Sequence, residues 1–253
     1  MPDRDDAVSM DWSDARTLRA LIVWLVALAG VALVAGYSRM HPTGWQMGTF
    51  GDILRYREAM SMFLFAPAIS LCFWQLVRAL GRGRPSPLCM ALAVLSIYFI
   101  ACGMGMHDPM NRIQGAYAAP DAMSATLRTT IVYFDDRLGH WVFWWGYALG
   151  TWVLGIQQVL SPLDRPIRPA ARWILAAVTL ATLWVMLTNL WDEYPQTLAD
   201  LCVIAAAVLV PTVAWLTRRV SLFRLPVLLV IIPAFWGSII GTLLCWTFRY
   251  WLK

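Results

Sequence analysis

The sequence predicts an all-α, polytopic membrane protein with seven transmembrane helices. Hydrophobic residues make up 60% of the 253 residues, charged residues make up only 14%, and the mean hydropathy is +0.60. Too little polar surface remains to cover a soluble domain of this size. Long apolar segments also recur along the chain, and each can cross a hydrocarbon core of about 30 Å as a helix.

The expected spans are separated by polar stretches, and the stretches 81–85 and 161–166 contain helix breakers. In chain order the seven spans are Leu21–Tyr37, Ala59–Leu76, Leu88–Met106, Phe134–Leu160, Trp173–Leu190, Leu198–Leu216 and Leu225–Trp251. Residues 1–20 form a polar, acidic N-terminal arm, and residues 21–253 form a single transmembrane domain. No internal repeat is visible, which disfavours an inverted-repeat transporter.

Basic residues indicate the orientation of the spans. Twelve of the 20 arginines and lysines lie on the side of the N-terminal arm, and eight lie on the opposite side. By the positive-inside rule the N-terminus is expected to be cytoplasmic, and seven spans then place the C-terminus outside. The net charge of +5 follows from this topology and from anionic lipid headgroups, so no nucleic-acid partner is expected.

The N-terminal arm and the cysteines indicate the compartment. The first apolar segment follows an arm with five aspartates and has no convincing small-residue cleavage site, so we expect it to remain as an anchor. The five cysteines all lie within expected spans and form no CxxC pair, so a disulfide framework is not indicated. We expect an integral protein of the bacterial inner (plasma) membrane.

Two of the three histidines, His107 and His140, lie beside carboxylates at the ends of expected spans. His140 lies within an aromatic segment, where an ionisable side chain is costly unless it faces a partner or a cavity. The third and fifth spans end, and the fourth and sixth begin, on the non-cytoplasmic side. The ionisable residues expected at comparable depth on that side are His107, Asp108, Asp135, Asp136, His140, Asp192, Glu193 and Asp200.

The local pattern predicts how the neighbours of each histidine are placed. Asp108 followed by Pro109 is typical of an N-cap with proline at the first helical position. The third span is therefore expected to end near His107, with a bend between His107 and Asn111. Asp136 and His140 are four residues apart on a continuous helix and are expected to share one face.

These residues predict a divalent metal site that opens to the non-cytoplasmic face. The expected ligands are His107, Asp136, His140, Asn111, Asp192 and Glu193. Imidazole nitrogens and carboxylate oxygens suit zinc or iron better than copper, and an open coordination position would activate water. A carboxylate outside the ligand set, Asp135 or Asp108, is the expected general base.

Two other interpretations of these residues remain open. Met104, Met106 and Met110 surround His107, and thioether ligands favour Cu(I), which suits a copper-handling or oxidase-assembly protein. Alternatively, Asp136 and His140 form only a surface pair near a helix N-terminus. The chain is then a structural subunit whose tryptophans face membrane-protein partners or the membrane interface.

The leading functional hypothesis is a metal-dependent integral membrane enzyme, first of all a hydrolase that acts on a lipid or another apolar small molecule. The bilayer supplies such substrates, and the aromatic fourth span can line a slot for an acyl or isoprenoid chain. Several other classes are excluded. Three histidines are too few for a membrane di-iron desaturase, the seventh span lacks a lysine for a retinal Schiff base, and no Gly-x-Ser-x-Gly elbow or phosphate loop is present.

A glycine-rich stretch that ends in a histidine, followed by an aspartate on the next helix, resembles the seven-span zinc hydrolases that include alkaline ceramidases and adiponectin-receptor-like proteins. On this resemblance Gly103 stands where that family has a serine, His107 matches the first zinc histidine, and Asp135 or Asp136 matches the conserved aspartate. The loop between these motifs is longer here. The segment Leu225–Trp251 also lacks the HxxxH pair that the family places in its seventh span.

Overall fold

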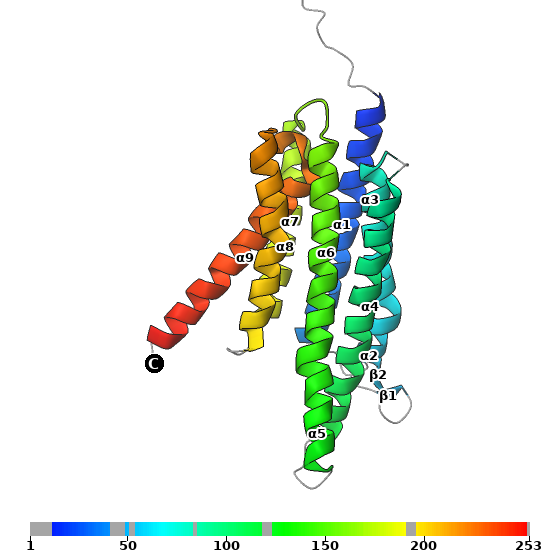
Figure 1. The fold of residues 1–253 in the computed structure, drawn as a ribbon, viewed down its shortest axis with the longest axis vertical. Coiled ribbons are helices and arrows are strands. Elements are labelled where there is room, and N and C mark those ends of the chain that lie inside the picture. Colours follow the sequence, from blue (N-terminus) through cyan, green and yellow to red (C-terminus); the bar gives the residue numbers. More distant parts are fainter. Residues whose placement is uncertain are drawn as a thin grey trace, which may run out of the picture.

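The computed structural model describes residues 12–40, 49–50, 54–82, 85–117, 123–190 and 196–251, and nearly all of them are helical (Figure 1). Three elements pack as long single helices near the start and middle of the chain: α1 (Trp12–Met40), α4 (Pro87–Ala116) and α7 (Pro169–Leu190). Two more follow, α8 (Gln196–Arg218) and α9 (Pro226–Trp251), joined through the 3₁₀ turn η3 (Leu222–Arg224).

The two remaining long helices are each built from three contiguous elements with a π-helical segment in the middle. The first comprises α2 (Tyr56–Met60), η1 (Ser61–Phe65) and α3 (Ala66–Leu80). The second comprises α5 (Ala125–Val132), η2 (Tyr133–Gly139) and α6 (His140–Leu160). A short antiparallel pair, β1 (Thr49–Phe50) and β2 (Leu54–Arg55), precedes α2.

Six of these helices are long and apolar enough to cross a membrane, which supports the expected class of helical integral membrane protein. They are Asp14–Ser38, Tyr56–Leu80, Pro87–Ala116, Pro169–Leu190, Leu198–Arg218 and Pro226–Arg249. The helix α6 is not among them. The helix α6 contains four tryptophans, three glycines and the pair Gln157 and Gln158. These residues lower its mean hydropathy.

The long helices form a closed ring around a main hydrophobic core. The order around the ring is α1, α3, α4, α6, α8, α9 and α7, and α7 contacts α1 again. The sequential neighbours α7 and α8 scarcely touch, because α9 packs against both. Each helix contributes at least one buried residue to the core, for example Leu21, Leu76, Ala93, Ala148, Leu175, Val208 and Ala234.

The ring has two ends, which we call the N-terminal end and the histidine end. The N-terminal end is where α1 begins, and it lies at the top of Figure 1. The histidine end carries β1, β2, α2, α5 and η2, and it lies at the bottom of Figure 1, where α4 and the α5–η2–α6 helix extend beyond the other helices.

Glycines allow α4 and α6 to approach closely along their length. A Cβ added at Gly103 would lie 2.5 Å from the backbone nitrogen of Phe143, and one at Gly146 would lie 2.7 Å from that of Ile100. The hydroxyl of Ser96 also donates a 2.7 Å hydrogen bond to the carbonyl of Gly146. The two helices are therefore in backbone contact, and this contact continues toward the histidine end.

The expected break after His107 is wrong. The helix α4 continues through Pro109 to Ala116, so His107 and Asn111 lie one turn apart on the same helix. A proline removes one backbone hydrogen bond, but a helix packed against neighbours in a membrane protein tolerates that loss. The packing of α4 against α6 and η2 on both sides of Pro109 outweighs the local signal for a cap.

Two helices begin earlier than the hydropathy pattern indicates. The first helix begins at Trp12, within the polar arm, and the fourth begins at Ala125 rather than Phe134. Ser124 sets the second start, because its hydroxyl accepts a hydrogen bond from the backbone N–H of Leu127 at 3.2 Å.

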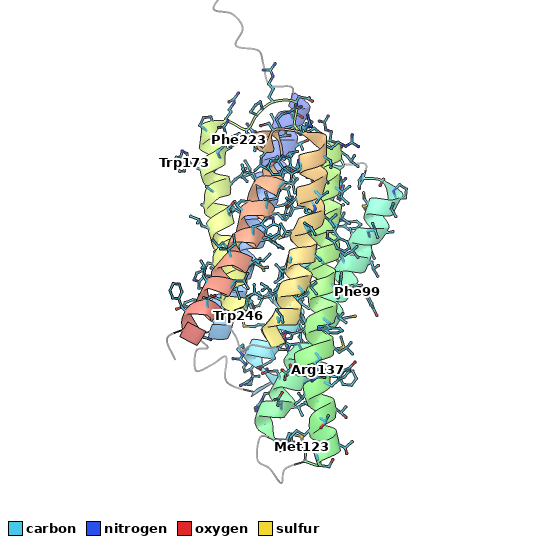
Figure 2. All side chains as sticks on the ribbon, turned by 60° about the vertical axis from the view of Figure 1, so that its left-hand side comes forward. Phe99, Met123, Arg137, Trp173, Phe223 and Trp246 are labelled. Carbon is cyan, nitrogen blue, oxygen red and sulfur yellow. The ribbon has the colours of Figure 1, made fainter. Side chains whose placement is uncertain are left out.

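At the N-terminal end, the buried carboxylate of Asp14 ties α1 to two loops. It accepts a 2.7 Å hydrogen bond from the backbone N–H of Asp164 and a 3.1 Å one from Arg82. The guanidinium of Arg172 also covers the ring of Phe223, 4.2 Å from its centroid, and Phe223 lies at this end of the bundle (Figure 2). These contacts fix the connections between helices at this end.

Replacing Asp14 with alanine is expected to lower the free energy of unfolding by about 1 kcal/mol, because a partly buried N–H and a guanidinium lose their acceptor. Thermal unfolding of the purified protein in detergent measures the change. Asp164→Ala is the matched control, since Asp164 contributes its backbone N–H and its side chain is exposed. Equal stability of the two variants would contradict the role given to Asp14.

Candidate histidine and aspartate site

His107, on α4, forms an ion pair with Asp135 in the π-helical segment η2. The Nδ1 atom of His107 lies 2.6 Å from Oδ1 of Asp135. The side chain of Asp135 is 0% exposed and that of His107 is 14% exposed. A fully buried carboxylate is costly without a partner, and the imidazole of His107 is the ion-pair partner of Asp135.

His140, the first residue of α6, forms a hydrogen bond with Asp200 on α8. Its Nδ1 atom lies 3.0 Å from Oδ2 of Asp200, whose side chain is 8% exposed. The side chain of His140 is 37% exposed, so it is the more accessible of the two imidazoles. The pair joins α6 to α8, and three helices thus contribute to the site.

The two imidazoles are in direct contact. Their ring centroids lie 4.7 Å apart with an interplanar angle of 76°, an edge-to-face arrangement. Each ring turns its Nδ1 atom toward its own aspartate. This is the arrangement in which a carboxylate orients a metal-ligating or proton-transferring histidine.

The π-helical segment explains how Asp135 and His140 reach the same neighbour. In a regular α-helix, two residues five apart point about 140° away from each other. A π-turn closes after five residues, so it brings such a pair back to one side. Because η2 spans Tyr133–Gly139, both Asp135 and His140 contact His107 across the interface with α4.

Gly139 gives His107 the space that it occupies. A Cβ at Gly139 would lie 3.2 Å from both the backbone nitrogen and the Cβ of His107, and 2.9 Å from the carbonyl oxygen of Phe134. The last π-helical residue is thus pressed against the backbone at His107. The glycine contacts of α4 with α6 therefore extend into the site.

The other expected site residues are placed less centrally. Asp108 is buried at 6% exposure, and its Oδ2 has no hydrogen-bond partner among the described residues. Asp136 is half-buried and interacts electrostatically with Asp135 and both imidazoles. Asn111 is exposed on α4. Asp192 and Glu193 lie outside the described residues.

Asp200 is the partner that the sequence did not single out. It was one of several acids expected at this end, and only its position inside an apolar segment distinguished it from them. Within the ranges that the structure describes, no group of three or more histidine, cysteine, aspartate or glutamate side chains is arranged to hold a metal ion. The two imidazoles with their aspartates are the centre of the site.

The fold and the site together define a helical integral membrane protein with two histidine–aspartate pairs at one end of the bundle. No protein-family model, curated protein or solved structure matches this chain. The likeness to the seven-span zinc hydrolases therefore remains a resemblance of short motifs.

Proposed function

We propose that α6 is a seventh span, with the N-terminus in the cytoplasm and the C-terminus outside. The support is its central place in the ring, where it packs between α4 and α8 and contacts α3 and α9. An odd number of spans also puts most basic residues on the cytoplasmic side. The histidine end then faces away from the cytoplasm.

Helix lengths support a position of the site at the membrane boundary. His107 lies a rise of about 30 Å beyond Pro87, where α4 begins, and His140 lies about 30 Å from Leu160, where α6 ends. The hydrocarbon core is also about 30 Å thick. If Pro87 and Leu160 lie at one boundary of the hydrocarbon core, the two imidazoles lie at its opposite boundary. There they are within reach of both lipid and water.

On this basis we propose that the protein is a metal-dependent membrane enzyme, a hydrolase that acts on a lipid or another apolar substrate. The observation that carries the proposal is the contact between two imidazoles that are each oriented by a buried aspartate. Buried ionisable groups are expensive in a membrane bundle and mark functional sites.

In the proposed mechanism His107 and His140 would hold a divalent zinc or iron ion, and Asp136, whose charge interacts with both imidazoles, is the candidate for a further ligand. The metal, when bound, would polarise the substrate carbonyl or phosphoryl oxygen and lower the pKa of a water molecule. Asp135 and Asp200 would orient the two imidazoles toward the ion. Asp108, which has an unpartnered oxygen, is the candidate general base.

The ring contact also supports a second candidate, proton transfer by the two imidazoles without a metal. Each histidine has the aspartate that a general base requires for orientation, and the two lie close enough to act on one substrate as base and acid. In this case hydrolysis would persist after treatment with a chelator. Loss of activity with a chelator and recovery with zinc or iron would overturn this candidate.

The metal content of the purified protein tests the first proposal. We expect about one zinc or iron per chain, and we expect its loss in the double variant His107→Ala, His140→Ala. His41→Ala is the control, because it removes the third histidine and should leave the metal in place. Elemental analysis of the folded proteins provides the measurement.

Three outcomes of the metal analysis change the conclusion. A stoichiometric metal that remains in the double variant would contradict the assignment of ligands. Copper in place of zinc or iron would favour the copper-handling alternative. A well-folded wild-type protein without stoichiometric metal would remove the metal proposal and leave proton transfer or a structural role.

A further inference from the structure

A second group of charged residues lies at the histidine end, on the short connection that leads into α2. The carboxylate of Glu58 is 3% exposed and binds two guanidinium groups. Arg55 contacts both carboxylate oxygens, at 2.9 and 3.0 Å from Nε, with a further contact from its terminal nitrogen. Arg57 donates one hydrogen bond of 2.9 Å to the same carboxylate.

Among the described residues, this arrangement fixes two arginines and uses only part of their hydrogen-bonding capacity. Each guanidinium has five N–H donors, and the four contacts to Glu58 use fewer than half of the ten. Two positive charges against one negative charge leave a net charge of +1. The side chains of Arg55 and Arg57 are 16% and 21% exposed, so both still reach the surface.

The position of the group matches that of lipid phosphates. A candidate span begins at Tyr56, so Arg55 and Arg57 flank the first residue of that span. Both β2 and α2 contact α4, the helix that carries His107. Fewer of the basic residues lie on this side than on the other, eight against twelve.

We propose that Arg55 and Arg57, held in place by Glu58, bind the phosphate of an anionic lipid headgroup. Paired guanidiniums recognise phosphate oxygens through planar, charge-assisted hydrogen bonds. A guanidinium that is already immobilised by a buried carboxylate loses little conformational entropy on binding. The proposal stands independently of the metal-dependent activity, because none of its three residues belongs to the histidine site.

Native mass spectrometry of the full-length protein, exchanged into detergent with added lipid, tests the proposal. We expect the wild type to retain a phosphatidylglycerol molecule in preference to phosphatidylcholine. Arg57→Ala is expected to weaken this retention roughly tenfold or more, because a charge-assisted contact is lost. Arg57→Lys keeps the charge and the fold but not the planar donor group, and we expect a smaller loss.

Arg137→Ala is the control, since Arg137 is an exposed arginine at the same end of the bundle (Figure 2). Equal retention by Arg57→Ala, Arg137→Ala and the wild type would overturn the proposal and leave the group as a structural ion pair. Competition by inorganic phosphate would support the site but identify a soluble phosphate as its ligand. The same measurement on the His107→Ala, His140→Ala variant should give the wild-type result, which separates this site from the histidines.

Discussion

Asp135→Asn is expected to cost roughly 10- to 100-fold in metal affinity, the usual effect of removing the carboxylate that orients a metal-ligating histidine. The variant keeps the shape of the side chain but removes the charge that holds Nδ1 of His107 at 2.6 Å. Isothermal titration of the metal-free protein with zinc measures this affinity. If the site works without a metal, the same substitution should lower the hydrolytic rate instead.

Asp136→Asn provides the matched control, because it removes an identical charge one residue away. Asp136 is half-buried and interacts with the imidazoles only through space, whereas Asp135 is fully buried against His107. We therefore expect the larger loss from Asp135→Asn. A larger loss from Asp136→Asn would instead support Asp136 as a direct ligand and contradict an orienting role for Asp135.

Gly103→Ala is expected to destabilise the protein by about 1–3 kcal/mol, as overpacking of a close interface does. The added methyl group would lie 2.5 Å from the backbone nitrogen of Phe143, so one of the two helices must move. His107 lies one turn further along the same face of α4, and a displaced α4 would also separate it from Asp135. Thermal unfolding in detergent and zinc affinity measure the two effects.

Gly105→Ala is the control for this experiment, because a Cβ at Gly105 meets no atom within 4 Å. This substitution is expected to be neutral or slightly stabilising, since alanine favours a helix more than glycine does. Similar destabilisation by both substitutions would show that helix propensity, and not the contact between α4 and α6, determines the effect.

Hydropathy predicts most of the helices because length and apolar content are properties of each segment alone. The ends of α7, α8 and α9 lie within four residues of the expected positions. The failures occur where packing outweighs a local signal. Pro109 lies inside α4, although the local sequence favours a cap there, and α5 extends the fourth helix beyond its apolar segment from the N-cap at Ser124.

The histidines of the site are predictable because ionisable residues are rare in apolar segments. Their partners are not predictable, because each pair joins two different helices: His107 with Asp135, and His140 with Asp200. Regular helical spacing also favoured Asp136 as the residue that shares a face with His140. The structure instead brings Asp135 to His107, since η2 changes the angular relation between residues on either side of it.

The π-helical segment has a consequence for how distant relatives of this chain should be compared. A π-turn amounts to one residue inserted into an α-helix. A relative without that residue would need an aspartate four positions before its histidine, rather than the five that separate Asp135 from His140, to keep the same contact. An alignment without a gap between 133 and 139 would then match the aspartate of the relative to Asp136. The correspondence between that aspartate and Asp135 would be missed.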